Sequence, residues 1–168
     1  MAKVMVNLRG ADKINQMLRD LPKHLTQGKT GGIAAKSLRK GGRVLVKEEK
    51  KTLRAAIEAG TNYSTGTLEK KLTVKRVKYD GKGERMNVTV RKGNYKTAPN
   101  GTERTGKKSR PTFYAVGSFL EYGTSKQPAV PWVRPALTSK GKEAIETVND
   151  DLIKQLDKVA QKMLPKVK

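Results

Sequence analysis

The apolar pattern near the C-terminus is the feature that most constrains the fold. Apolar side chains recur there every three or four residues, at Ala144, Ile145, Val148, Leu152, Leu156, Val159 and Met163, which is the spacing of one helix face. Pro135 suits the first turn of such a helix because its φ angle is already set. The pattern predicts an amphipathic helix of about 25–30 residues, with Gly141 as a weak point.

The first third of the chain predicts a short strand followed by helices. Alternating apolar residues predict the strand over residues 3–8, and an apolar stripe at helical spacing follows over residues 12–21. Pro22 ends that helix. After a polar, glycine-rich loop, apolar residues from Ile33 to Leu53 again fall near one helical face.

This second helix contains an adjacent pair of glycines, Gly41 and Gly42. Each glycine costs about 1 kcal/mol relative to alanine within a helix. The helix is therefore either interrupted at the pair or packed closely against a neighbouring element. Residues 47–51 and Arg54 are expected to form its solvated side, and Gly60 suits a C-terminal cap.

The middle of the chain predicts an antiparallel hairpin. One strand is expected from Leu68 to about Tyr79, with Leu72 and Val74 alternating. A turn then follows over residues 80–83, and Met86, Val88 and Val90 alternate in a second strand.

A basic, mobile loop of about 20 residues is expected at about 92–112. The apolar stretch over 113–121 is consistent with either a strand or a helix. Together the elements predict a single α+β domain over residues 1–168, with N-terminal helices, a small antiparallel β-sheet and a long C-terminal amphipathic helix.

The charge of the chain is strongly positive, with 37 Lys and Arg against 15 Asp and Glu, a formal net charge of +22. Residues 67–110 carry 14 basic and 4 acidic side chains, so the excess is greatest in the middle. Such a surface can bind nucleic acid or dock onto an acidic protein. The candidate basic surface consists of Lys70, Lys71, Lys75, Arg76, Lys78, Arg91, Lys92, Lys107, Lys108 and Arg110.

Several classes of site find no support in the sequence. There is no cysteine, and His24 is the only histidine, so thiolate and histidine-cluster metal sites are excluded. Asp80 and Glu84 flank the expected turn, and Asp150 and Asp151 belong to an expected solvated helix face. We therefore expect no catalytic residue, no cofactor, no metal and no enzymatic activity. No apolar run is long enough to span a membrane, and the N-terminus lacks the apolar stretch of a signal peptide.

The segment from residue 113 to residue 137 is the most informative part of the chain. Gly123 permits a sharp turn after the apolar stretch, and Pro128 and Pro131 stiffen the following loop. Trp132 and Arg134 are residue types enriched in interface hot spots. We favour an interface role for this loop. The alternative is that Trp132 is a core residue in a plain connection to the last helix.

This segment resembles the tail-completion family of long-tailed bacteriophages, the head–tail joining proteins similar to minor tail protein Z of lambda-like phages. The resemblance rests on Glu-Tyr-Gly-Thr at 121–124, Pro-Ala-Val-Pro-Trp at 128–132 and Arg-Pro-Ala at 134–136. A weaker match, Thr-Gly-Thr-Leu at 65–68, opens the basic hairpin. The candidate interface residues are Glu121, Tyr122, Gly123, Thr124, Pro128, Pro131, Trp132, Arg134 and Pro135.

The resemblance implies a structural virion protein made in the host cytoplasm. It would sit at the head-proximal end of the tail, in the neck, as a subunit of a ring that is commonly six-fold. Its partners would be the tail terminator, the tail tube and a head-completion or stopper protein, with non-specific contact to DNA in the channel as a further expectation. The alternative is a small basic protein that binds nucleic acid without sequence specificity.

Overall fold

The structure is a computed structural model of the chain, and it describes residues 21, 32–59, 66–77, 84–96, 103 and 110–163. The strand expected over 3–8, most of the helix expected over 12–21, His24, Gly60 and the turn at 80–83 lie outside these residues. So do Lys78, Lys107 and Lys108 of the candidate basic surface.

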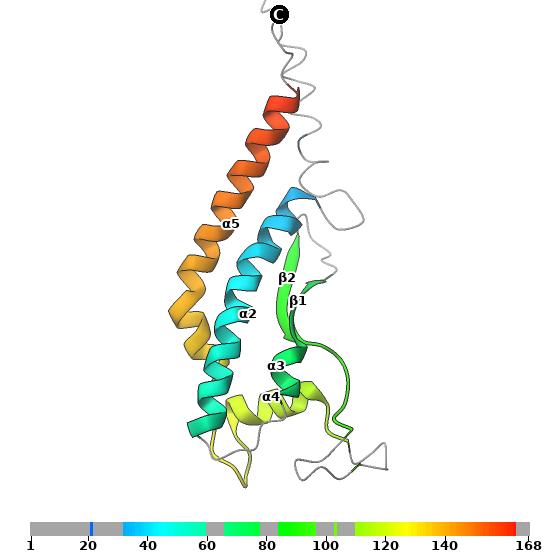
Figure 1. Ribbon diagram of the computed structural model, residues 1–168, viewed down its shortest axis with the longest axis vertical. Coiled ribbons are helices and arrows are strands. Elements are labelled where there is room, and N and C mark those ends of the chain that lie inside the picture. The colour runs from blue at the N-terminus through cyan, green and yellow to red at the C-terminus, as the bar shows by residue number, and fades with distance from the viewer. Residues whose placement is uncertain are drawn as a thin grey trace, which may run out of the picture.

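Two long helices and a hairpin form the body of the described structure. The elements are α2 (Ile33–Ala59), α3 (Thr67–Lys71), β1 (Leu72–Val77), β2 (Arg85–Val90), α4 (Phe113–Tyr122) and α5 (Val133–Met163). α2 and α5 run side by side in opposite directions, and the hairpin lies along the other side of α2. The two short helices, α3 and α4, are gathered at one end (Figure 1). The α+β class, the small antiparallel sheet and the long C-terminal helix are thus confirmed.

The glycine pair in α2 marks a close approach between elements. α2 continues through both glycines without interruption. A Cβ atom on Gly41 would lie 2.6 Å from the carbonyl oxygen of Ala144 in α5, and one on Gly42 would lie 2.8 Å from the side chain of Val74 in β1. Of the two alternatives that the sequence leaves open, close packing is therefore the one observed. α5 and the hairpin contact α2 at successive residues.

A buried polar contact also joins α2 to α5. Ser37 donates a hydrogen bond to the Asp151 carboxylate at 2.9 Å, and Lys40 forms an ion pair with the other carboxylate oxygen. The hydrogen bond from Lys40 makes the largest contribution, and with the one from Ser37 it holds the pKa of Asp151 below its usual value. The expectation that Asp151 lies on a solvated face is wrong, because this residue is only 7% exposed and has two partners on α2.

The hairpin pairs Leu72 with Val90 and Val74 with Val88. Its first strand is shorter than the sequence predicts. Residues 67–71 form the helix α3, which begins after Gly66 in a left-handed conformation, φ 64°. In this helical turn Leu68 is buried, whereas the alternation of apolar residues begins only at Leu72. The strand expected from Leu68 is therefore wrong in its first four residues.

The two ends of the expected loop at 92–112 are hydrogen-bonded to each other. Asn94 forms an isolated antiparallel bridge with Thr112, and Tyr95 donates its backbone amide to Pro111 at 3.0 Å. The Tyr95 ring packs edge-on against Phe113, with centroids 4.9 Å apart. These contacts lead directly into α4, which resolves the stretch over 113–121 as a helix.

The core lies at the end of the molecule where α4 meets α2 and the hairpin. Its members are Leu53, Ala56, Leu68, Leu72, Phe113, Leu120 and Trp132. α5 spans 31 residues and passes through Gly141 without a break, as a slightly longer helix than expected. Among the described helices, none is both long and apolar enough to cross a membrane.

Candidate functional site

The carboxylate of Glu121, at the end of α4, caps the beginning of α5. One of its oxygens accepts hydrogen bonds from the backbone amides of Trp132 at 2.7 Å and Val133 at 2.8 Å, and the other accepts from Arg134 at 3.4 Å. A negative group at a helix N-terminus satisfies amides that have no partner within the helix. Glu121 is only 6% exposed, so this cap is an internal link between two helices.

Trp132 joins three elements at the same place. Its indole donates a hydrogen bond to the carbonyl of Gly117 in α4 at 3.2 Å, and its own carbonyl accepts one from the Thr52 hydroxyl in α2 at 2.6 Å. The side chain is 3% exposed. Trp132 is thus a core residue of the monomer, which is the alternative that the sequence leaves open. An interface role for the segment stays a prediction and rests on its exposed residues.

The loop between the helices is held in a tight turn. Gly123 has φ +76°, and a Cβ atom at that position would lie 2.7 Å from the backbone nitrogen of Ala129. Thr124 and Gln127 exchange backbone hydrogen bonds of 2.8 and 3.3 Å, and Val130 donates to Leu120 at 2.8 Å. We refer to residues 117–134 as the clasp, because its contacts fix α4 against the start of α5.

The clasp divides the candidate interface residues into two groups. Glu121 and Trp132 are buried, and Gly123 is partly buried. The others are exposed on the outer surface: Tyr122, Thr124, Pro128, Pro131, Arg134 and Pro135. Arg134 lies over the Tyr122 ring, with its guanidinium carbon 5.7 Å from the centroid, so these two form one exposed pair.

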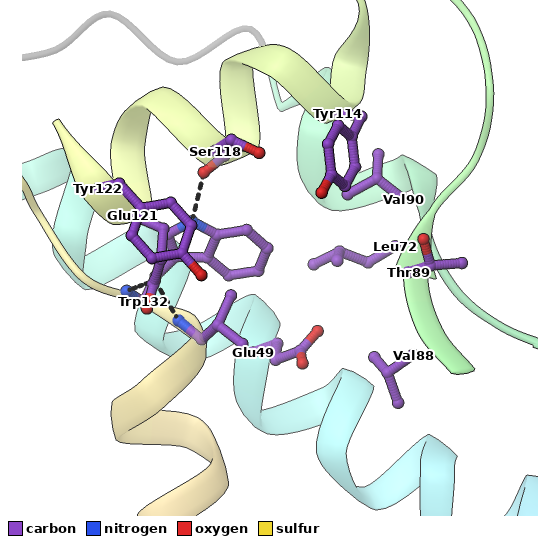
Figure 2. Close-up of a pocket in the computed structure, with 12 residues that line it drawn as sticks. Glu49, Leu72, Val88, Thr89, Val90, Tyr114, Ser118, Glu121, Tyr122 and Trp132 are labelled. Carbon is purple, nitrogen blue, oxygen red and sulfur yellow. Dashed lines mark hydrogen bonds between the residues drawn. The ribbon is translucent and has the colours of Figure 1, made fainter. Parts of the chain in front are cut away.

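A small open pocket lies beside the clasp, between α4, α2 and the hairpin. It has a volume of about 160 Å³. Figure 2 shows Tyr114, Ser118 and Tyr122 on the α4 side, Val88, Thr89 and Val90 on the β2 side and Glu49 reaching in from α2. No pattern in the sequence indicates this pocket.

The expectation that Glu49 lies on the solvated side of α2 is wrong. The residue is 7% exposed. Burial, with the nearby Glu121 carboxylate as a second cause, raises the pKa of Glu49 to about 7. One hint in the sequence indicates that Glu49, and not Glu48, is buried. Glu49 is four residues before Leu53 and so shares its helical face.

The candidate basic surface is partly brought together along the hairpin and its continuation. Lys70, Lys75, Arg76, Arg91 and Lys92 are exposed, and Lys71 and Arg110 are partly buried. Arg76 is not a free charge, because its guanidinium forms hydrogen bonds of 2.7 and 2.6 Å with Glu84. Lys71 lies 5.6 Å from the centre of the Phe113 ring.

The described ranges hold no group of three or more His, Cys, Asp or Glu residues placed to bind a metal ion.

Comparison with known protein families identifies a relationship over most of the described helices and the hairpin. Residues 15–123, more than half of the chain, match the family described as "Bacteriophage HK97-gp10, putative tail-component". No curated protein and no solved structure has significant similarity to the chain. The match covers α2, the hairpin and α4, and ends at Gly123 within the clasp. The chain therefore belongs to the HK97-gp10-like family of bacteriophage tail components.

Proposed function

We propose that the protein is a structural subunit of the phage neck, which completes the head-proximal end of the tail and helps to join it to the head. The family match carries this proposal, because it identifies a bacteriophage tail component. In this role the protein resides in the virion, acts without catalysis, and contacts the tail terminator, the tail tube and the head-completion or stopper protein.

We further propose that the subunits form a ring, with six-fold symmetry. A ring joins two different patches of the same chain, each meeting the other patch on the next subunit. The exposed part of the clasp suits one such patch, because Tyr122 and Arg134 belong to residue types that dominate interface energies. The loop behind them is already ordered by Gly123 and the 124–127 turn, so binding would cost little further entropy.

Electron microscopy of a parent phage that lacks this gene tests the proposal. We expect filled heads together with separate or defective tails, and joined particles when the wild-type gene is supplied in trans. Normal joined particles in the absence of the gene would contradict a joining role.

A second candidate function, sequence-independent binding of nucleic acid, is favoured by the +22 net charge and by the exposed lysines and arginines along the hairpin. Any protein of this charge binds DNA at low salt, so only tight binding at physiological salt supports this function. Fluorescence anisotropy with duplex and single-stranded DNA, repeated across a salt series, gives the affinity and its salt dependence. Binding that vanishes near 150 mM salt would exclude this function.

A further inference from the structure

The pocket beside the clasp combines an acidic interior with apolar walls and an aromatic rim. Leu72, Val88, Val90 and Val133 provide apolar wall surface. Tyr114 and Tyr122 lie along α4 and are 69% and 68% exposed. Figure 2 shows the Glu49 carboxylate pointing into the space between these walls. The volume, about 160 Å³, is below the 300–1,000 Å³ typical of pockets for drug-sized ligands.

Glu49 stands in this pocket without a partner among the described residues. The nearby Glu121 carboxylate is occupied by the backbone amides at the start of α5. No described side chain or backbone amide donates a hydrogen bond to the Glu49 carboxylate, and the residue is only 7% exposed. A buried carboxylate without a partner is costly, and a cation placed in the pocket would remove this cost.

The lining decides which kind of cation fits. A divalent metal ion needs six or more oxygen ligands, whereas the pocket offers the one free carboxylate of Glu49 and two hydroxyls, of Thr89 and Ser118. A long basic side chain matches better, because its aliphatic stem packs on apolar walls. A guanidinium in particular pairs with a carboxylate through two parallel hydrogen bonds and stacks on tyrosine rings.

We propose that this pocket receives an arginine side chain from a second copy of the chain, with the guanidinium paired to Glu49. The proposal deepens the ring assembly proposed above and rests on it, since it supplies one of the two patches that such a ring requires.

Charge complementarity selects a second copy as the partner. The chain carries 37 basic side chains and a net charge of +22, so a second copy is rich in the cations that a single acidic pocket attracts locally, against the overall repulsion between copies. Arg43, Arg85 and Arg91 are exposed and take part in no ion pair with the described residues, which provides donors from α2 and from the hairpin. An anionic pocket on a basic protein would also disfavour DNA at this position.

Self-association of the purified full chain provides the first test. Sedimentation velocity over a concentration series compares the wild type with Glu49→Gln and with Glu146→Gln, which removes one exposed acid from the outer side of α5. We expect Glu49→Gln to weaken self-association by at least about tenfold, as expected for loss of a buried charge pair. We expect Glu146→Gln to have little effect. Circular dichroism verifies that both variants are folded.

A small probe tests the pocket directly. N-acetyl-arginine amide should lower the pKa of the Glu49 carboxyl, followed by carbon-13 NMR, and should compete with self-association. The neutral analogue N-acetyl-citrulline amide should do neither.

Three results would overturn the inference. They are equal association of Glu49→Gln and wild type, a wild type that stays monomeric at all concentrations, and a Glu49 pKa that responds equally to both probes. None of these results contradicts the joining role, which the gene-deletion particles test separately. If the deletion phage still forms joined particles, the neck ring on which the inference rests is contradicted. A self-association that depends on Glu49 would then still be observed, but it would have no role in such a ring.

Discussion

Glu121 and Trp132 are connected across the turn between α4 and α5, where the carboxylate of the first accepts the backbone amide of the second at 2.7 Å. The indole of Trp132 returns to α4 through the carbonyl of Gly117. Two hydrogen bonds therefore join residues that are eleven and fifteen positions apart in the sequence. Gly123 and the 124–127 turn bring the two residues to this distance. The clasp explains why a glutamate, a glycine and a tryptophan occur together in this segment.

Glu121→Gln should destabilise the monomer by about 1–3 kcal/mol, because an amide replaces the charge that caps α5 and one of its two oxygens is lost. Urea unfolding followed by circular dichroism gives this free energy. Glu143→Gln is the matched control, since the Glu143 carboxylate is exposed and, among the described residues, forms an ion pair with Lys140 three residues away. We expect its effect to stay within about 0.5 kcal/mol. Equal effects of the two substitutions would show that the cap contributes little.

Trp132→Ala should cost about 3–5 kcal/mol of stability, because it empties a core position and removes the hydrogen bond to Gly117. Arg134→Ala should leave the monomer folded, since that side chain is 74% exposed. Thermal melts distinguish the two. In phage complementation, Arg134→Ala therefore tests the exposed part of the clasp in a folded protein. A folded variant that joins heads and tails normally would remove Arg134 from the interface.

Gly41→Ala should destabilise the protein although alanine is the better helix former. Its Cβ would lie 2.6 Å from the backbone oxygen of Ala144, so α2 and α5 would have to separate. Gly141→Ala in α5 is the matched control, because its Cβ would meet only Leu137 at 3.6 Å. We expect the control to stabilise the protein by up to about 1 kcal/mol. A stabilising Gly41→Ala would contradict the close packing of the two helices.

The pH dependence of stability should report on Glu49. Its pKa rises from 4.5 to about 7 on folding, so the native state binds the proton more tightly than the unfolded state. Its contribution to stability is present below pH 4.5 and is lost as the pH rises through 7. The charged groups near it are Glu121 on α4 and, beyond that carboxylate, Arg134 on α5.

Glu49→Gln should remove this loss. We expect the variant to exceed the wild type in stability by about 2 kcal/mol at pH 8 and by much less at pH 5. Unfolding at the two pH values, followed by the fluorescence of Trp132, measures the difference. An advantage that is the same at both pH values would show that Glu49 does not titrate in this range.

The regular elements could be predicted from sequence because each has one dominant period. Apolar residues recur at helical spacing in α5 and alternate at strand spacing in β2, and both elements lie where these patterns indicate. The start of β1 could not be predicted, since Leu68 is apolar and in phase with Leu72 although it belongs to a helical turn after Gly66. The glycine pair in α2 predicts close packing only as one of two alternatives. A tertiary neighbour, Ala144, decides between them.

The buried acids are harder to predict because charge alone indicates solvent. Asp151 is buried against Ser37 and Lys40, which lie more than a hundred residues earlier in the chain. Glu49 is buried among elements that the sequence does not place relative to one another. The residue types of the clasp segment indicate its importance, whereas only the fold shows which of its residues are buried and which are exposed.

The antiparallel pairing of α2 and α5 separates the two ends of the molecule. α5 has 31 residues, which at 1.5 Å per residue span about 45 Å. α4 and the start of α5, which the clasp joins, lie at one end of this pair, and the C-terminal end of α5 lies at the other (Figure 1). A contact at the clasp and a contact at the far end of α5 therefore use separate surfaces of the subunit. The subunit is long enough to act as a spacer between two neighbouring layers of an assembly.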